Sequence, residues 1–200
     1  MSDIESFVRF CESDFGTAVM DREAAYVRDH VDPTDTILDV GCGIGSLEER
    51  FTSYDIVGLD RSAAMVRTAR ERVAVPFIQG DARSLPIPTG GIDAVVFVAT
   101  LEFIPDIDAA LAEVTRVLEP DGRVVALLLN TQSTYVQSNL QREGSYFQRM
   151  VHQDTDALVE RIGEYVDGKQ ESFLGIADET VVESSAPDTA AVTVVVGTPQ

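Results

Sequence analysis

The chain has 200 residues, of which 34 are acidic and 15 basic, and its formal net charge is −19. Hydrophobic residues make up 44% of the sequence, which excludes a disordered acidic tail and suffices for the core of one α/β domain. There is no apolar run of the roughly 18 residues that span a bilayer and no secretory signal pattern, so we expect a soluble, cytoplasmic protein. Cys11 and Cys42 lie in dissimilar contexts, which indicates neither a disulfide framework nor a metal site.

The acidic residues are spread along the whole chain, and Lys169 is the one lysine among the 15 basic residues. An even excess of acid describes the whole surface, whereas a localised run would indicate an arm that binds a partner. In concentrated salt the repulsion between carboxylates is screened within a few Å, so we interpret the composition as that of a halophilic protein. The alternative, a surface that repels nucleic acid and anionic lipid, stays open.

Strands and helices alternate through the first 130 residues. A helix is predicted over residues 17–31, followed by a buried strand over Thr36–Val40, a glycine-rich loop and a helical stretch over residues 46–52. The next predicted elements are strands at 56–59, 77–79, 92–98 and 123–129 and helices at 62–73 and 106–118. This alternation predicts a doubly wound, Rossmann-like α/β sheet that is mostly parallel, with helices on both faces.

The pattern changes after Asn130. Residues 131–150 are polar and aromatic with weak periodicity, and a helix is predicted over residues 154–166. Two further strands, at 171–176 and 191–197, follow each other without a helix between them. We therefore expect these two strands to be antiparallel, so that an antiparallel last strand closes the sheet.

The glycine-rich loop and two acids that follow it predict a ligand site. Gly41, Gly43 and Gly45 directly follow a buried strand, and backbone N–H groups of such a loop can approach a ligand that a Cβ would exclude. Asp60 ends the next strand, where a carboxylate can accept both hydroxyls of a ribose, and Asp81 follows the third, where it can accept an adenine amine. Each acid alone also fits a solvated turn, but the carboxyl ends of parallel strands lie side by side.

Two kinds of cofactor fit such a site. The dinucleotide fingerprint is G-x-G-x-x-G, whereas this loop has G-x-G-x-G followed by Ser46. Asp39 lies two residues before the first glycine, where it would repel a pyrophosphate. The same carboxylate suits a cofactor with an amino group and a sulfonium, so the residues favour S-adenosylmethionine over a nicotinamide or flavin dinucleotide.

Several segments resemble the motifs of one enzyme family. Ile37–Gly45 is similar to the first motif of class I S-adenosylmethionine-dependent methyltransferases, in the small-molecule branch that includes ubiquinone and menaquinone biosynthesis enzymes. Val57–Met65, Gly80–Pro86 and Ile92–Ile104 are similar to the motifs that follow in that branch. The resemblance implies S-adenosylmethionine as cofactor, S-adenosylhomocysteine as product, and one methyltransferase domain over residues 1–200. Within it we expect a cofactor-binding core at about 15–130, an acceptor or lid segment at about 131–168 and closing strands at about 169–198.

The resemblance also assigns cofactor contacts to ten residues: Asp39, Gly41, Gly43, Gly45, Asp60, Arg61, Met65, Asp81, Ala82 and Ala99. It implies that Asp39 and the glycines hold the methionyl end and that Asp60 holds the ribose. Arg61 and Met65 would flank the adenine. Asp81 would hold the adenine amine, and the backbone N–H of Ala82 would donate to the adenine ring. Ala99 would line the sulfonium.

The acceptor is less well defined by the sequence. Methyl transfer from a sulfonium is an in-line displacement in which alignment supplies most of the rate, and a general base is needed only if the nucleophile must lose a proton. Glu102 and His152 are candidate bases, and each also fits a structural role at a helix end or on the surface. The chain has no Asn/Asp-Pro-Pro-Tyr segment, no Pro-Cys nucleophile and no basic patch interleaved with aromatics. We therefore expect a small-molecule acceptor and neither a nucleic-acid nor a membrane partner.

Two other function classes stay open. One is a regulatory protein that binds S-adenosylmethionine without turnover, and the other is an NAD(P)-dependent oxidoreductase. The acceptor atom and the oligomeric state are not determined by the sequence.

Overall fold

The structure is a computed structural model that describes residues 3–200. The strands are β1 Thr36–Val40, β2 Asp55–Asp60, β3 Phe77–Gln79, β4 Ile92–Val98, β5 Leu118–Leu129, β6 Val166–Ala177, β7 Thr180–Val182 and β8 Ala190–Pro199. The α-helices are α1 Asp3–Cys11, α2 Asp14–Arg28, α3 Ala63–Arg72, α4 Ile107–Val117, α5 Thr134–Gln141 and α6 Thr155–Ile162. Three short 3₁₀ helices are η1 Glu48–Arg50, η2 Leu101–Phe103 and η3 Tyr146–Arg149.

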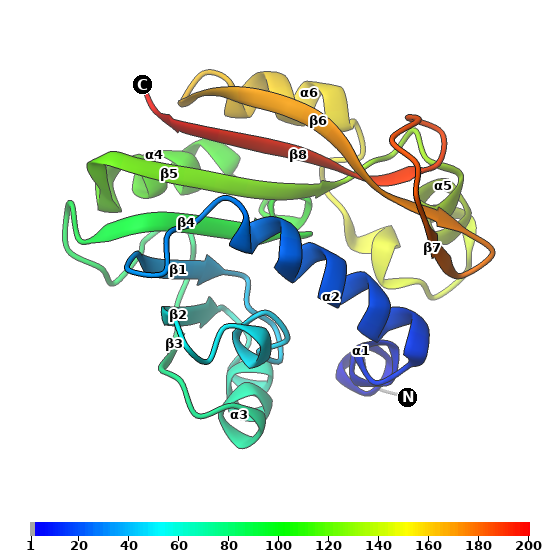
Figure 1. The fold of residues 1–200 in the computed structure, drawn as a ribbon, viewed down its shortest axis with the longest axis horizontal. Coiled ribbons are helices and arrows are strands. Elements are labelled where there is room, and N and C mark those ends of the chain that lie inside the picture. The colour runs from blue at the N-terminus through cyan, green and yellow to red at the C-terminus, as the bar shows by residue number, and fades with distance from the viewer. Residues whose placement is uncertain (1–2) are drawn as a thin grey trace.

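The strands form one mixed sheet in the order β3-β2-β1-β4-β5-β8-β6-β7 (Figure 1). β3, β2, β1, β4 and β5 are parallel to one another, and the chain reverses its direction of travel across the sheet between β1 and β4. In open α/β sheets, ligands bind outside the carboxyl ends of the strands at such a reversal point. In Figure 1 the arrows of β1 and β2 point toward the side on which α1 and α5 lie.

The last strands close the sheet in antiparallel fashion, as predicted. β8 is antiparallel to both β5 and β6, and β7 adds a short hairpin to β6. The helix predicted over residues 154–166 ends at Ile162, because Val166 already belongs to β6 and pairs with Pro199 of β8. β6 is longer than predicted and β7 was not predicted, since both depend on pairing partners rather than on apolar periodicity.

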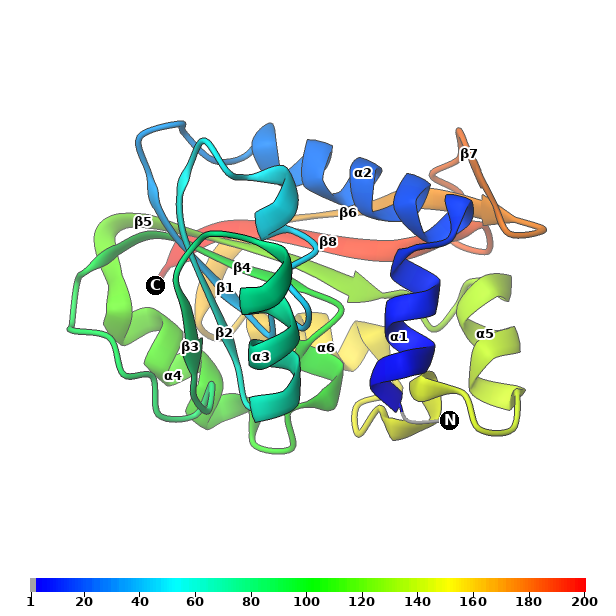
Figure 2. The same cartoon turned by 90° about the horizontal axis from the view of Figure 1, so that it is seen from below.

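Helices cover both faces of the sheet, which confirms the predicted fold class. Figure 2 shows α2 on one face and α4 and α6 on the other. Successive residues of β1 point to opposite faces, with Ile37 in the cluster under α2 and Leu38 in the cluster under α4 and α6. The central strands are thus buried on both sides, which is why they are continuous apolar runs in the sequence. No helix within residues 3–200 is both long and apolar enough to cross a membrane.

Two local predictions differ from the structure. The stretch over residues 46–52 contains only the 3₁₀ helix η1, because the turns that begin at Gly41 continue up to it and Phe51 is already buried under α2. α1 was not predicted at all.

The N-cap predicted at Ser62 is confirmed, since its hydroxyl accepts the N–H of Met65 at 3.3 Å at the start of α3.

Gly58 of β2 provides a test of packing between η1 and the sheet. A Cβ at Gly58 would lie 2.3 Å from Glu48 Oε1 and 2.6 Å from Cδ1 of Phe77, and both side chains are buried. We expect Gly58→Ala to lower the free energy of unfolding by about 1–3 kcal/mol through overpacking, measured by urea denaturation. Gly91→Ala is the matched control, because its Cβ would lie 3.5 Å from the nearest atom. Equal stability of the two variants would contradict this packing.

Candidate functional site

Four turns that carry the predicted site residues meet at one edge of the sheet. Because β3, β2, β1 and β4 are neighbours in that order, their carboxyl ends are adjacent. This places Asp81 beyond β3, Asp60 at the end of β2, Gly41 after β1 and Ala99 after β4 along one line. The structure thus brings together features that are up to 58 residues apart in the sequence.

The glycine loop has a backbone that only glycine adopts without strain. Gly41, Gly43 and Gly45 have φ values of +88°, +56° and +81°. The N–H groups of Gly41 and Cys42 donate to Leu59 O at 2.7 and 3.0 Å, which folds the loop back onto β2. A Cβ at Gly41 would lie 2.3 Å from the Thr100 side chain, so the turn after β4 packs directly against the loop.

Asp60 links this loop to the start of α3. Its Oδ2 accepts the N–H of Gly43 at 3.0 Å, and its Oδ1 accepts the N–H of Ser62 at 2.7 Å. Each carboxylate oxygen can accept a second hydrogen bond, and the side chain is only half-buried. Asp60 therefore fixes the loop and still has lone pairs for a pair of ligand hydroxyls.

Ala99 lies in a strained conformation next to the glycine loop. Its φ of +47° falls in the left-handed region, which non-glycine residues rarely adopt and which clusters at functional sites. Its N–H donates to Leu127 O at 2.8 Å, so pairing with β5 holds the strained residue in place. The chain turns sharply here and directs Thr100 against Gly41.

The adenine end of the predicted site is more exposed. Arg83 donates to the Asp81 carboxylate from Nε at 2.9 Å and from Nη2 at 2.7 Å, which lowers the pKa of Asp81 to about 2. Asp81 is therefore an ionised acceptor at neutral pH. Ala82 is buried, Met65 is half-buried against Ile44, and Arg61 is exposed.

Two buried carboxyls lie under the glycine loop. Asp39 is 3% exposed and its Oδ1 has no hydrogen-bond partner within residues 3–200, and burial raises its pKa to about 7. Glu48 is fully buried, and burial together with the nearby Asp39 raises its pKa to about 10. The sequence did not indicate that Glu48 belongs to the site. It lies next to Leu47 in a stretch predicted to be helical, where a charged side chain is expected to face the solvent. Within residues 3–200, no three His, Cys, Asp or Glu side chains are grouped so that they could hold a metal ion.

The structure places both candidate bases in contact with main-chain groups. Leu129 N–H donates to Glu102 Oε1, and Glu102 is 1% exposed with its pKa raised by burial to about 7. Nε2 of the His152 ring forms a hydrogen bond with the carbonyl oxygen of Ile104 at 2.9 Å. The backbone N–H of His152 donates to the carbonyl oxygen of Glu102 at 3.1 Å. These contacts tie the turn after β4 to β5 and to the segment before α6.

Aromatic rings from distant segments lie beside the glycine loop. Phe7 of α1 would be 3.3 Å from a Cβ at Gly43. Its ring centroid lies 6.4 Å from that of Tyr146 in η3, which lies 4.9 Å from that of Phe103 in η2. α1 and α5 are both found beyond the carboxyl ends of the parallel strands (Figure 2). The loop is therefore flanked by an apolar wall to which η3 contributes, within the segment 131–168 that was predicted to face the acceptor. α1 is the part of that wall that the sequence did not predict.

Burial of Glu102 makes a testable contribution to stability. Because its pKa is raised to about 7 in the folded protein, this carboxyl favours folding most below its unfolded pKa, and the contribution is lost as the pH rises through 7. We expect the neutral variant Glu102→Gln to gain roughly 3 kcal/mol relative to the wild type between pH 4 and pH 8, measured by urea unfolding. Glu119→Gln, at an exposed position of β5, is the control and should follow the wild type. A Glu102→Gln curve parallel to the wild type would show that Glu102 ionises in the folded protein without cost.

Known proteins are similar to the part of the chain that carries this site. Residues 38–126 match the methyltransferase domain family. The demethylmenaquinone methyltransferase of Thermus thermophilus is 37% identical over 100 residues, which is 46% of each chain. A ubiquinone/menaquinone biosynthesis C-methyltransferase of a Caulobacter species is 29% identical over 181 residues, 78% of this chain and 71% of that one. The chain thus spans about half the length of the first of these relatives.

A solved structure supports the same fold. The Thermotoga maritima protein described as an S-adenosylmethionine-dependent methyltransferase, possible histamine N-methyltransferase, superimposes with a TM-score of 0.81 at 19% identity, over 98% of this chain and 95% of that one. At this identity the likeness shows the fold alone. The matched domain and the relatives show that this chain is similar to S-adenosylmethionine-dependent methyltransferases, among them ubiquinone and menaquinone biosynthesis enzymes, and the superposition shows that it shares their fold.

Proposed function

We propose that this chain is an enzyme that transfers the methyl group of S-adenosylmethionine to a small-molecule acceptor by in-line displacement. The observation that carries the proposal is the convergence of the positive-φ glycine loop, Asp39, Asp60 and the strained Ala99 at the reversal point between β1 and β4. The similarity to methyltransferases implies the cofactor, and these residues fit it. The fit is electrostatic as well as steric, because Oδ1 of the buried Asp39 has no hydrogen-bond partner within residues 3–200 and lies beside the glycine loop.

The cofactor would extend along the line of turns from β4 to β3. We assign its methionyl end to Asp39 and the three glycines, and its ribose to the free lone pairs of Asp60. The sulfonium would then lie at Ala99. The adenine would lie over the exposed end of the site, at these four residues: Arg61, Met65, Asp81 and Ala82.

Alignment and the exclusion of water are the protein's main contributions to such a displacement. The bound cofactor supplies the electrophilic methyl group. The rings of Phe7, Phe103 and Tyr146 form the wall from which the acceptor would approach, which favours an acceptor with an apolar or ring-shaped part. Glu102 and His152 are engaged by main-chain groups, so we assign them the task of holding the turn after β4 and not that of a base. The names of both relatives refer to quinone biosynthesis and are in keeping with a small acceptor.

Binding of S-adenosylhomocysteine tests the assignment of the cofactor. We expect micromolar affinity in isothermal titration calorimetry, and a loss of about 10- to 150-fold in Asp60→Ala, because hydrogen bonds to a carboxylate are removed. Asp55→Ala is the matched control, since Asp55 lies at the opposite, exposed end of the same strand. Binding of NAD in place of S-adenosylhomocysteine would favour the oxidoreductase alternative.

Transfer of label from methyl-labelled S-adenosylmethionine to fractions of a metabolite extract separates an enzyme from a regulatory binder. Label in a small-molecule fraction supports the proposal, with Asp60→Ala as the inactive control. Binding of the cofactor without transfer to any fraction would favour the regulatory protein.

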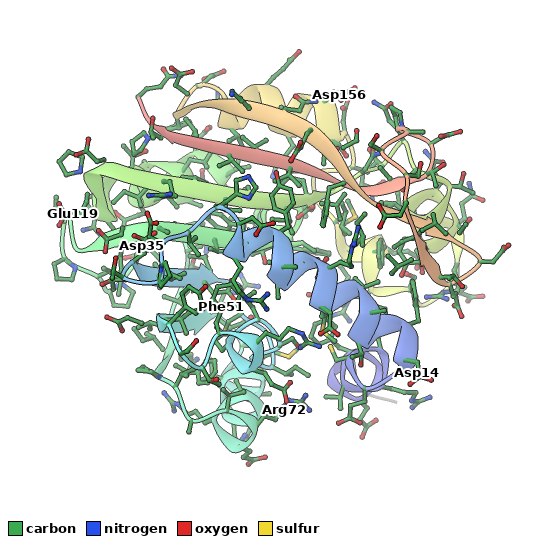
Figure 3. All side chains as sticks on the ribbon, viewed as in Figure 1. Asp14, Asp35, Phe51, Arg72, Glu119 and Asp156 are labelled. Carbon is green, nitrogen blue, oxygen red and sulfur yellow. The ribbon has the colours of Figure 1, made fainter. Side chains whose placement is uncertain are left out.

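We also propose that the acidic surface is an adaptation to concentrated salt. Among the acidic side chains that the structure describes, the buried ones are Asp35, Asp39, Glu48 and Glu102. The remaining acids are exposed or half-buried, and Figure 3 shows Asp14, Glu119 and Asp156 at the periphery of the molecule. Their mutual repulsion destabilises the compact state in dilute buffer and is screened by salt.

The midpoint of thermal unfolding is expected to rise steeply between low and molar KCl, because screening removes this repulsion. Circular dichroism at a series of KCl concentrations measures the midpoint. A midpoint that does not respond to salt would contradict the adaptation and leave the cofactor assignment intact.

A further inference from the structure

We propose that Glu48 is a positioning residue of the cofactor site, a neutral carboxylic acid that keeps Asp39 ionised to receive the ammonium group of the methionyl end. The inference rests on the proposed function of the same site. It adds a residue that none of the sequence motifs contains and a proton that the site must hold.

The backbone brings Glu48 under the glycine loop. It lies three residues after Gly45, and its carboxyl points back onto β2, where Oε1 fills the space in which a Cβ of Gly58 would lie. Gly58 is the register partner of Asp39 in the neighbouring strand β1. The two carboxyls therefore lie over the same pair of parallel strands, and only a glycine at position 58 leaves room for the second one.

Most of the carboxyl oxygens of this pair have no hydrogen-bond partner within residues 3–200. Glu48 is fully buried, and within residues 3–200 neither of its oxygens nor Oδ1 of Asp39 has a hydrogen-bond partner. Two buried carboxylates without donors are strongly unfavourable, because desolvation and mutual repulsion both oppose ionisation. A proton held by Glu48 removes one of the two charges and supplies the one hydrogen bond that the pair can make.

The charges with the largest effect on the pair are acidic. Asp60 at the end of β2 raises the pKa values of both carboxyls, and all three acids raise the pKa of the Cys42 thiol in the loop. Within the described chain, no arginine, lysine or histidine is among the groups with the largest effect on the pKa of either carboxyl. Glu48 has the higher pKa, about 10, whereas burial raises the pKa of Asp39 to about 7, and the neighbouring Glu48 carboxyl, which can act as a donor when it is protonated, opposes that rise. The pair thus carries one negative charge and one proton just above neutral pH, which matches one ammonium group.

Proton linkage tests the pair in the wild-type chain. Because the ammonium binds the ionised form of Asp39, binding of S-adenosylhomocysteine should release a proton below pH 7. Its affinity should rise about tenfold per pH unit up to about pH 7 and then level off. 5′-Methylthioadenosine keeps the adenosyl part but has no ammonium, so its affinity should not change over this range. Calorimetry in two buffers of different ionisation enthalpy counts the protons directly.

Two substitutions separate positioning from packing. Glu48→Met fills the same space without a donor, so the pKa of Asp39 should rise, and the affinity for S-adenosylhomocysteine at pH 6.5 should fall about tenfold if that pKa rises by one unit. Glu48→Gln retains a donor in its amide and should keep the wild-type pH profile. Neither variant should alter the affinity for 5′-methylthioadenosine.

The outcomes distinguish this inference from the proposed function. An unchanged pH profile in a folded Glu48→Met, or equal proton release with both ligands, would overturn the role of Glu48 while leaving the cofactor site in place. Should Glu48→Met fail to fold by circular dichroism, the proton count of the wild type and the profile of Glu48→Gln decide the matter. A wild-type chain that binds neither ligand at any pH would overturn the proposed function, and the role of Glu48 with it.

Discussion

The contact between the glycine loop and the turn after β4 is the constraint on which the rest of the site depends. Gly41 has no side chain, so Thr100 can approach it more closely than any Cβ would permit. This approach is possible only because Ala99 adopts a left-handed conformation that β5 holds in place. The loop, the β4 turn and the end of β2 thereby form one rigid edge, with Asp60 bonded to the loop at its centre. Because the edge is rigid, its backbone N–H donors lose little conformational entropy when a ligand binds.

Charge is distributed very unevenly between this edge and the rest of the molecule. Most carboxylates face the solvent, where water and salt screen them. Three of the four buried acids, Asp39, Glu48 and Glu102, lie at the carboxyl end of the parallel strands, and burial raises the pKa of each. Buried acids are costly, and perturbed pKa values cluster at functional sites. In this chain they mark the part of the sheet where the ammonium group of the proposed cofactor would compensate for that cost.

The wall beside the site is assembled from both ends of the chain. Phe7 comes from the first helix and Tyr146 from the segment before α6, and they meet near Gly43. The proposed cofactor side, by contrast, is built from consecutive βα turns. Such a division would allow the proposed acceptor side to vary without disturbing the turns to which we assign the cofactor.

What the sequence determined by itself is the set of elements whose residues are required locally. β1, β3 and β4 begin and end where the apolar runs predicted, because a strand buried on both faces must be apolar throughout. Gly41, Gly43 and Gly45 were recognisable because their positive φ values exclude most other residues. The tertiary structure alone decided that η1 replaces a helix, that Glu48 turns inward over Gly58, that β6 and β7 pair as they do, and that α1 lies beside the loop. These features depend on partners distant in the sequence, and no local pattern records which neighbour a polar side chain or a short amphipathic helix will meet.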